Sequence, residues 1–581
     1  MKDKTTTIYK NAILNKATDV LQIFIKYIIV IISMLFLGFI FLQSFFGSTF
    51  LDFCESSFFI EKPFWSTVLI VLIPILIAII VKIILQKYSI SIVTPNYIFL
   101  GIVTVVYTIL MIMFVYKTGI PAMDDQELIL NAANDLLNNV PDMWDKGAYC
   151  YRFPNQNGFV LFVALGLKMF GADNQMVFQY LNIPMLILSS FFLSKTIYLL
   201  FNDKKLARYS YILLLGFFQL NCYVTFVYGT LYGLAASVAG IFLLIKYFKK
   251  RNIVNGLVGI SLLSIGYGFK SNYLIMIVAA CLLLLFDAIV KKSLKSVISL
   301  VWGIVFYVVV VTSISSTIYH LTGKKVDEGT PNTAWVAMGL QESYKAPGWW
   351  NGYNAKVFAD NEYDISKTKE AISQNISERM EELKKDKDYT MSFFSKKTAS
   401  QWSEGTFECF YITNLDRGRL SNPTWTDSVK NLMVDGHSAN RAVTTICNYF
   451  IVFLWLGIIL FLIFDFRKLD AYKLIFAITF IGGFLFHLVW EAKGQYTIIY
   501  AYLMIPYMLR GYQLLLRRVC NISLGEKEAK EKRGTIIPVV VIALVVIVIG
   551  ISNNKVVNET IKLNGDKERY ESYMSLSLIH I

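Results

Sequence analysis

The sequence has little charge, few histidines and no paired cysteines. Only 17% of its 581 residues are charged, four are histidine, and the seven cysteines show no CxxC spacing. These residues therefore indicate neither a metal site nor a disulfide framework. No Gly-rich phosphate loop is present, so a nucleotide site is not expected. Strand-like alternation over ten-residue segments is also missing, which argues against a membrane β-barrel.

Long apolar runs are abundant instead. Hydrophobic residues make up 55% of the chain, and many runs are long enough to cross a hydrocarbon core of ~30 Å as a helix. We therefore predict an all-α polytopic membrane protein with interfacial helices and a mixed external loop region. We expect about 13 transmembrane helices, at residues 26–46, 64–86, 97–116, 177–200, 206–221, 224–246, 253–269, 271–288, 296–316, 446–465, 471–489, 496–515 and 535–552.

The formal net charge of +14 comes mainly from short Lys/Arg clusters between the apolar runs. Such clusters mark cytoplasmic loops under the positive-inside rule, so we expect no nucleic-acid partner. With the N-terminus inside, the internal loops carry clusters such as Lys82/Lys87, Lys204/Lys205/Arg208, Lys249/Lys250/Arg251 and Lys291/Lys292/Lys295. The chain is therefore predicted to be a multi-pass cell-membrane protein with its large polar loops outside.

Spans and polar stretches divide the chain into four parts. They are an N-terminal transmembrane module with an external loop at 117–176, an external region, the C-terminal transmembrane helices and a polar tail, at residues 1–316, 317–445, 446–552 and 553–581. The last six residues resemble a translated sequencing adapter, so we base no inference about the fold on them. The apolar run 158–171 is too short to span and contains Lys168, so we predict a helix on the outer membrane surface.

Adjacent carboxylates open the polar loop, at Asp124 and Asp125 in the stretch MDDQ. One interpretation is structural, with Asp124 as N-cap and Glu127 completing a capping box for an amphipathic helix. The other is catalytic, because a carboxylate at the interface could take a proton from an acceptor hydroxyl. Each carboxylate also tends to raise the pKa of the other. The two interpretations are compatible, since a helix N-terminus holds a catalytic side chain in a fixed position.

Three cations are candidates for binding a phosphate group. Lys270 interrupts two apolar runs, Lys493 follows Glu491 in a late turn, and Arg152 lies in the first polar loop. Each has a structural alternative. Lys270 could be a snorkelling lysine, Lys493 could form a charge pair with Glu491 at the end of a span, and Arg152 could be a surface arginine. Trp349 and Trp350 could stack on sugar rings or anchor a loop at the membrane surface.

Four stretches together resemble the GT-C superfamily of membrane glycosyltransferases, which includes protein O-mannosyltransferases and the aminoarabinose transferase of lipid A. They are MDDQ, YCYRFPNQNGFVLFVALGLKMFG, SKTIYLLFNDKK and WEAKGQYTIIYAYLMIPY, at residues 123–126, 149–171, 194–205 and 490–507. Two further segments, 331–354 and 402–411, resemble external loops of Gram-positive members that decorate cell-surface polymers.

The resemblance implies transfer of a sugar, with inversion, from a polyprenyl phosphate to an acceptor outside the membrane. The acceptor would be a cell-surface glycopolymer, a lipid or a protein, and membrane lipids would surround the enzyme. Asp124 aligns with the catalytic aspartate, and Asp125 stands where many relatives have Glu. Lys270, Arg152 and Lys493 are then expected to bind the donor phosphate, and Glu491, Trp349 and Trp350 the acceptor or sugar. No metal ligand is assigned, and a divalent cation is left open.

Two other functions stay open. A polymerase or ligase of lipid-linked glycans would rely on loop arginines, for which Arg417, Arg419 and Arg441 are available. A flippase or transporter of lipid-linked sugars would be no enzyme, and it should place charges in mid-span. Most candidate residues here fall at the outer ends of spans, which favours chemistry at the interface.

Overall fold

The computed structural model describes residues 2–52, 55–90, 93–119, 121–171, 174–413, 425–434 and 437–523, with side chains from residue 18 to residue 520. Helices dominate this part of the chain, and nine of them are long and apolar enough to cross a membrane. The prediction of a helical polytopic membrane protein is therefore confirmed. The segment predicted at 535–552, the tail, Arg417 and Arg419 lie outside the described residues.

Nine of the expected spans coincide with the nine candidate spans. Their helices are α1 (Lys2–Phe46), α2 (Phe64–Lys87), α3 (Tyr97–Thr118), α7 (Met176–Phe201), α10 (Thr230–Lys250), α12 (Leu274–Val290), α13 (Leu294–Thr322), α20 (Ser438–Phe464) and α21 (Ile475–Val489). Hydropathy locates them well because only an unbroken apolar helix satisfies its backbone in lipid.

Three other expected spans have a different form. The single helix predicted at 206–221 is wrong, because the chain forms α8 (Lys204–Leu215) and α9 (Phe218–Cys222) with a break at Gly216. The segment 253–269 is the shorter helix α11 (Ile253–Phe269), which packs along α10. The segment 496–515 lies within α22 (Gly494–Ser523), whose basic residues lower its hydropathy.

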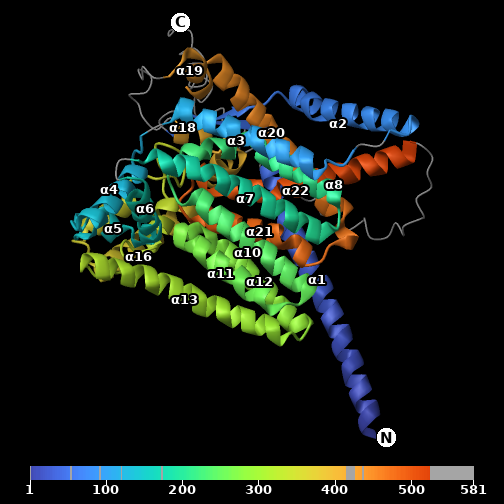
Figure 1. Cartoon of the computed structure of the whole chain (residues 1–581), viewed down its shortest axis with the longest axis horizontal. Helices are drawn as coiled ribbons and strands as arrows, with labels where there is room; N and C mark the ends of the chain where they lie inside the picture. Colours follow the sequence, from blue (N-terminus) through green and yellow to red (C-terminus); the bar gives the residue numbers. More distant parts are fainter. Residues whose placement is uncertain are drawn as a thin grey trace.

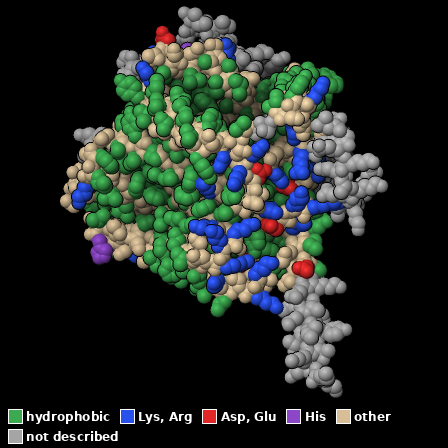
Figure 2. Space-filling model, turned by 45° about the vertical axis from the view of Figure 1, so that its right-hand side comes forward, with side chains coloured by type: hydrophobic (Ala, Val, Ile, Leu, Met, Phe, Trp, Pro, Cys, Tyr) green, Lys and Arg blue, Asp and Glu red, His purple; other side chains and the backbone are tan. Residues whose placement is uncertain are grey.

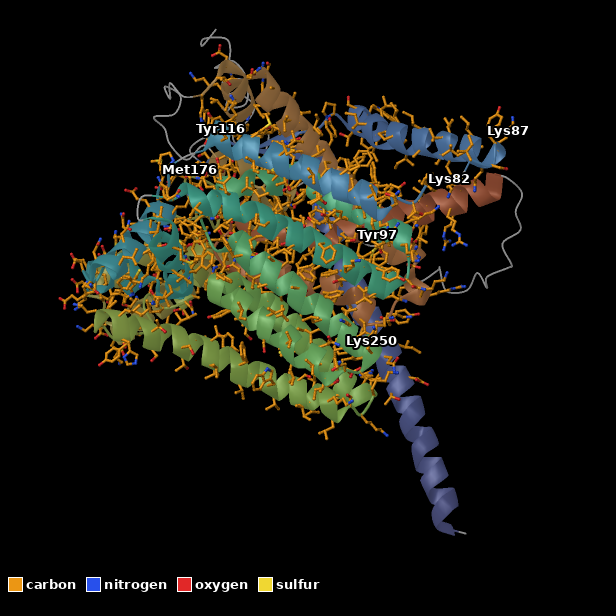
Figure 3. The ribbon with its side chains drawn as sticks, in the orientation of Figure 1. Lys82, Lys87, Tyr97, Tyr116, Met176 and Lys250 are labelled. Atoms are coloured by element: carbon orange, nitrogen blue, oxygen red, sulfur yellow. The ribbon has the colours of Figure 1, made fainter. Side chains whose placement is uncertain are left out.

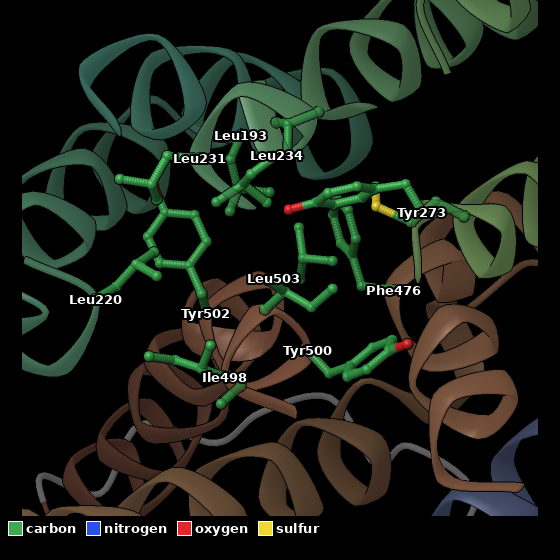
Figure 4. Packing of buried hydrophobic residues seen from close by; sticks show 14 of the residues in the cluster. Leu193, Leu220, Leu231, Leu234, Tyr273, Phe476, Ile498, Tyr500, Tyr502 and Leu503 are labelled. Atoms are coloured by element: carbon green, nitrogen blue, oxygen red, sulfur yellow. The ribbon is translucent and has the colours of Figure 1, made fainter. Parts of the chain in front are cut away.

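Helices α3, α7, α10, α11, α12 and α13 run side by side across the molecule (Figure 1). Between α7, α10 and α22 lies a core of large side chains, including Leu193, Leu231, Tyr502 and Leu503 (Figure 4). The hydroxyl of Tyr502 shares a 2.8 Å hydrogen bond with that of Ser190 on α7. This core fixes α22, and therefore the turn that precedes it, against the N-terminal half of the chain.

The two ends of the bundle differ in charge. Lys82, Lys87 and Lys250 lie at one end, and Tyr116 and Met176 lie at the other (Figure 3). Figure 2 shows Lys and Arg side chains gathered over the first of these, which we name the basic end. We name the opposite end, where α4, α5, α6 and α16 gather (Figure 1), the site end.

The site end is built from short helices, α4 (Asp125–Asn138), α5 (Tyr149–Arg152), α6 (Asn157–Phe170) and α16 (Ile365–Lys385). The predicted helix at 158–171 is confirmed as α6, which buries one face and exposes Lys168 on another. On α4 the predicted apolar face is confirmed at Ile129, Ala132 and Ala133, all fully buried. Val140 lies beyond the helix and is exposed, because α4 ends at Asn138.

Part of the region 317–445 packs against the helices of the bundle. The π-helical turn η5 (Ala399–Ser403) packs against α1 and α22, and Trp402 is buried among the rings of Phe480, Phe484 and Tyr500. Just beyond η5, Glu404 bridges to Thr49 of a hairpin formed by β1 (Gly47–Leu51) and β2 (Ser57–Glu61). The turn after η5 is thereby held at the site end.

Candidate functional site

Charged residues from distant parts of the chain meet at the site end. Asp125 begins α4, Lys270 follows α11, and Lys493 precedes α22. Both lysines act electrostatically on Asp125. Glu408, which precedes α18 (Cys409–Thr413), and Glu491 act on Lys493. We name these five residues the acid–lysine cluster.

The predicted capping box at Asp124 is wrong. Its side chain makes no capping hydrogen bond to the helix. The backbone is instead a turn closed by a 3.1 Å hydrogen bond from the Gln126 N–H to the Met123 carbonyl. Asp124 has φ 52° and ψ −129°, the values of the first central residue of a type II′ turn. A turn of this type favours glycine at this position, so the backbone of Asp124 is strained. Its side chain is exposed and does not cap the helix.

We expect Asp124→Gly to stabilise the protein by about 1 kcal/mol, because glycine adopts this backbone conformation without steric cost. Asp124→Val should destabilise it by a similar amount, since a β-branched residue is strained at positive φ. Thermal unfolding of both variants in one detergent compares them. A glycine variant that unfolds at a lower temperature than the valine variant would contradict the turn assignment.

Asp125 is exposed to water, although protein atoms crowd around its carboxylate. The buried Tyr149 of α5 forms a hydrogen bond with its carboxylate. Desolvation raises the pKa of Asp125, and the positive charges of Lys493 and Lys270 together with this hydrogen bond offset part of the increase. A carboxylate in this state is a stronger base than a surface aspartate.

Lys270 is buried, with 8% of its surface exposed. Its ammonium group donates a 2.8 Å hydrogen bond to the Thr230 hydroxyl and lies 4.9 Å from the ring centroid of Tyr228 and 5.5 Å from that of Tyr496. Burial, reinforced by Lys493, lowers its pKa to about 7. Among the described residues it forms no ion pair within 4 Å, so it is well placed to receive an anion.

Lys493 is held by carboxylates on several sides. Its ammonium lies 2.8 Å from Glu55 of the β1–β2 hairpin, and Lys345 pairs with the other oxygen of the same carboxylate. Burial alone would lower the pKa of Lys493, but Glu408, neighbouring tyrosines and Glu491 raise it above its ordinary value. Lys493 therefore stays charged and balances buried carboxylates, while its predicted contact with the donor phosphate stays a prediction.

Glu491 is 5% exposed, and burial raises its pKa. Its carboxylate accepts a 3.3 Å hydrogen bond from the Tyr496 hydroxyl. The buried Lys397 donates a 2.8 Å hydrogen bond to the carbonyl of Trp490, which fixes the turn. Glu491 is thus part of the cluster, while its predicted contact with an acceptor or sugar stays a prediction.

The remaining predicted residues lie around the cluster. Arg152 stands on α5 three residues after Tyr149, and its guanidinium stacks 5.2 Å from the ring of Phe153. Trp349 is 1% exposed, and its indole N–H donates a 2.8 Å hydrogen bond to Ser400. Trp350 is 43% exposed, with Lys345 over its ring. Of the two tryptophans, Trp350 offers the accessible face for a sugar, and the role of each of these residues stays a prediction.

Glu55 and Glu408 were missed as site residues by sequence reasoning. Glu55 had no predicted role, and Glu408 lay in the segment 402–411, which was noted only for its resemblance. Neither has a local motif, because both meet Lys493 only through the fold. No group of three or more His, Cys, Asp or Glu residues in the described chain is placed to hold a metal ion.

A comparison with protein families matches residues 24–516, a range that includes the whole acid–lysine cluster. The family is described as conserved hypothetical integral membrane protein. The chain belongs to this family. No curated protein and no solved structure matches the chain. The family membership agrees with the helical bundle and supports an integral, multi-pass membrane protein, while the chemistry must be argued from the cluster.

Proposed function

We propose that the protein is a membrane glycosyltransferase that moves a sugar from a polyprenyl phosphate to an acceptor on the extracytoplasmic side, with a GT-C-like fold. One observation carries the proposal: a water-accessible carboxylate of raised pKa, Asp125, and a buried unpaired lysine, Lys270, act on each other at the site end. The basic end opposite would be cytoplasmic by the positive-inside rule, which puts the cluster outside.

The proposed step needs only a carboxylate that accepts a proton and a cation that binds the phosphate. The acceptor oxygen forms a bond to the anomeric carbon while the bond from that carbon to the phosphate oxygen breaks. The electron pair of the broken bond leaves with the phosphate, and the hydroxyl proton passes to the carboxylate of Asp125. Lys270 would stabilise the growing negative charge of the phosphate. Because the polyprenyl tail would stay in lipid, its phosphate would lie at the interface, where Lys270 would meet it.

Asp125 is the better candidate for the base, although the family resemblance selects Asp124. Desolvation by the surrounding protein raises the pKa of Asp125, and Tyr149 forms a hydrogen bond with its carboxylate. Asp124 is exposed, and its backbone serves the turn that precedes α4. The juxtaposition of Asp125 with Lys270 and Lys493 supports this assignment, and the matched variants described below test it.

We expect Lys270→Met to lower kcat/KM for the donor by about 10- to 100-fold, because a charge-assisted contact to phosphate contributes about 1.5–3 kcal/mol. The test uses full-length protein in proteoliposomes with radiolabelled polyprenyl-phosphate hexoses, offered one at a time with membrane acceptors. Lys168→Met, on the exposed face of α6, is the matched control and should keep wild-type activity.

Two measurements separate the alternatives. Release of polyprenyl phosphate together with labelled acceptor supports transfer. Transbilayer movement of the labelled donor without cleavage would replace the proposal with a flippase. Elongation of a lipid-linked glycan without release of a single-sugar product would favour a polymerase. Unchanged transfer in Lys270→Met would overturn the role of this lysine.

A further inference from the structure

A small cavity adjoins the acid–lysine cluster on the side of Glu408. It is lined by Leu51, Asp52, Glu404, Thr406, Glu408, Phe410, Tyr411 and Thr444. The ring of Tyr411 lies 6.0 Å from the ammonium of Lys493, so the cavity and the cluster share a wall. The hairpin β1–β2, the turn after η5 and α20 all contribute to this cavity, which the proposed transfer step does not use.

The two glutamates in the cavity differ in how their oxygens are satisfied. Glu404 accepts hydrogen bonds from the Thr406 N–H at 2.9 Å, the Thr406 hydroxyl at 2.6 Å and the Glu408 N–H at 3.1 Å. Glu408 uses one oxygen to accept a 2.7 Å hydrogen bond from the Gly494 N–H. Its Oε2 is buried without a hydrogen-bond partner, although the residue is only 1% exposed. An unpartnered buried carboxylate oxygen is costly unless something binds to it.

Charge and size limit what this oxygen can bind. Three carboxylates line the cavity, and no lysine or arginine is among its described lining residues. The nearby cations Lys493 and Lys345 pair with Glu55 and also act electrostatically on Glu408, but neither lines the cavity. The cavity therefore favours a positively charged group and disfavours an anion. Its volume of about 10 Å³ holds about one water-sized group, which admits the end of a chain and excludes a ring.

We propose that this cavity binds a primary ammonium group, with Glu408 Oε2 as its principal acceptor. An ammonium donates three hydrogen bonds, which Glu408 and the hydroxyl and carboxyl oxygens on the cavity wall can accept. At the site end, such a group is carried by an aminated lipid headgroup or by an aminated glycopolymer. The inference stands apart from sugar transfer, because it rests on the cavity alone.

The test measures thermal unfolding of the full-length protein in nanodiscs of phosphatidylglycerol at constant ionic strength. Methylammonium chloride, added in place of sodium chloride, should raise the unfolding temperature in a saturable way. Tetramethylammonium should give no such effect because it is too large, and methanol none because it lacks charge. Glu408→Gln should weaken the apparent affinity for methylammonium by at least about tenfold. Glu328→Gln, in an exposed loop, is the matched control.

A second variant keeps the test decisive if Glu408→Gln folds poorly. Thr444→Met fills the cavity without changing its charge, and it should also abolish the response to methylammonium. Equal stabilisation by methanol would reduce the cavity to a water site and overturn the proposal. Equal stabilisation by tetramethylammonium, or none by methylammonium, would overturn it as well. Among supporting results, competition by phosphatidylethanolamine nanodiscs identifies a lipid headgroup, and competition by a glycopolymer whose amino groups end flexible side chains identifies a glycopolymer.

Discussion

Asp125→Asn is expected to reduce sugar transfer by about 10²–10⁴-fold, the usual contribution of a general base. Asparagine keeps the size of the side chain and a hydrogen bond to Tyr149, but it cannot accept the proton of the acceptor hydroxyl. The variant should therefore fold and bind donor normally while kcat falls. Initial rates in proteoliposomes, with donor binding measured separately, distinguish this outcome from a folding defect.

The pH dependence gives a second signature of the same group. Asp125 acts as a base only when ionised, and its pKa lies above the ordinary value of 3.8. On the acidic side, activity should therefore fall as the pH drops through this raised pKa. The residual activity of Asp125→Asn should lack this acidic limb. An unchanged acidic limb in the variant would assign the titration to another carboxylate.

Asp124→Asn is the matched control, since it removes the adjacent charge from the same turn. We expect it to keep most of the activity, because Asp124 is exposed and its side chain makes no capping contact. Loss of transfer in Asp124→Asn with full activity in Asp125→Asn would restore the assignment that the family resemblance favours. Full activity in both variants would remove the pair from the mechanism.

The sequence predicted well what depends on local composition. Apolar runs located nine spans, and the short apolar run 158–171 located α6, because both signals are contained in one segment. The break at Gly216 was missed, since residues on both sides are apolar enough to suggest one continuous span. The capping-box prediction was wrong because it rested on residue types alone. The residue types fit a capping box, but the backbone of Asp124 adopts another conformation.

The cluster was predicted as separate residues and not as a constellation. Lys270, Lys493, Glu491 and Asp125 each attracted attention as a charge beside an apolar run, which is a local signal. Their partners Glu55 and Glu408 could not be found in this way, because each meets Lys493 from a segment far away in the chain. Trp349 looked accessible in an aromatic loop, and only the fold places it against Ser400.

Lys493→Met is expected to destabilise the protein by about 3–5 kcal/mol, because removing one partner of a buried ion pair leaves the other uncompensated. Glu55 has 2% of its side chain exposed and would lose its 2.8 Å contact, and Glu408 and Glu491 would lose the cation that offsets their burial. Denaturation in mild detergent, followed by fluorescence, measures the change. Lys345→Met should cost less, because Glu55 then keeps Lys493.

A double variant separates the cost of stranded charge from the loss of packing. In Lys493→Met with Glu55→Gln, one carboxylate no longer needs a cation, so part of the lost stability should return. The coupling between the two substitutions should exceed about 1 kcal/mol, whereas Lys493→Met with the distant Glu328→Gln should be additive. Additive behaviour of the first pair would mean that Lys493 stabilises the protein by packing alone. Its charge would then not be what stabilises the buried carboxylates of the cluster.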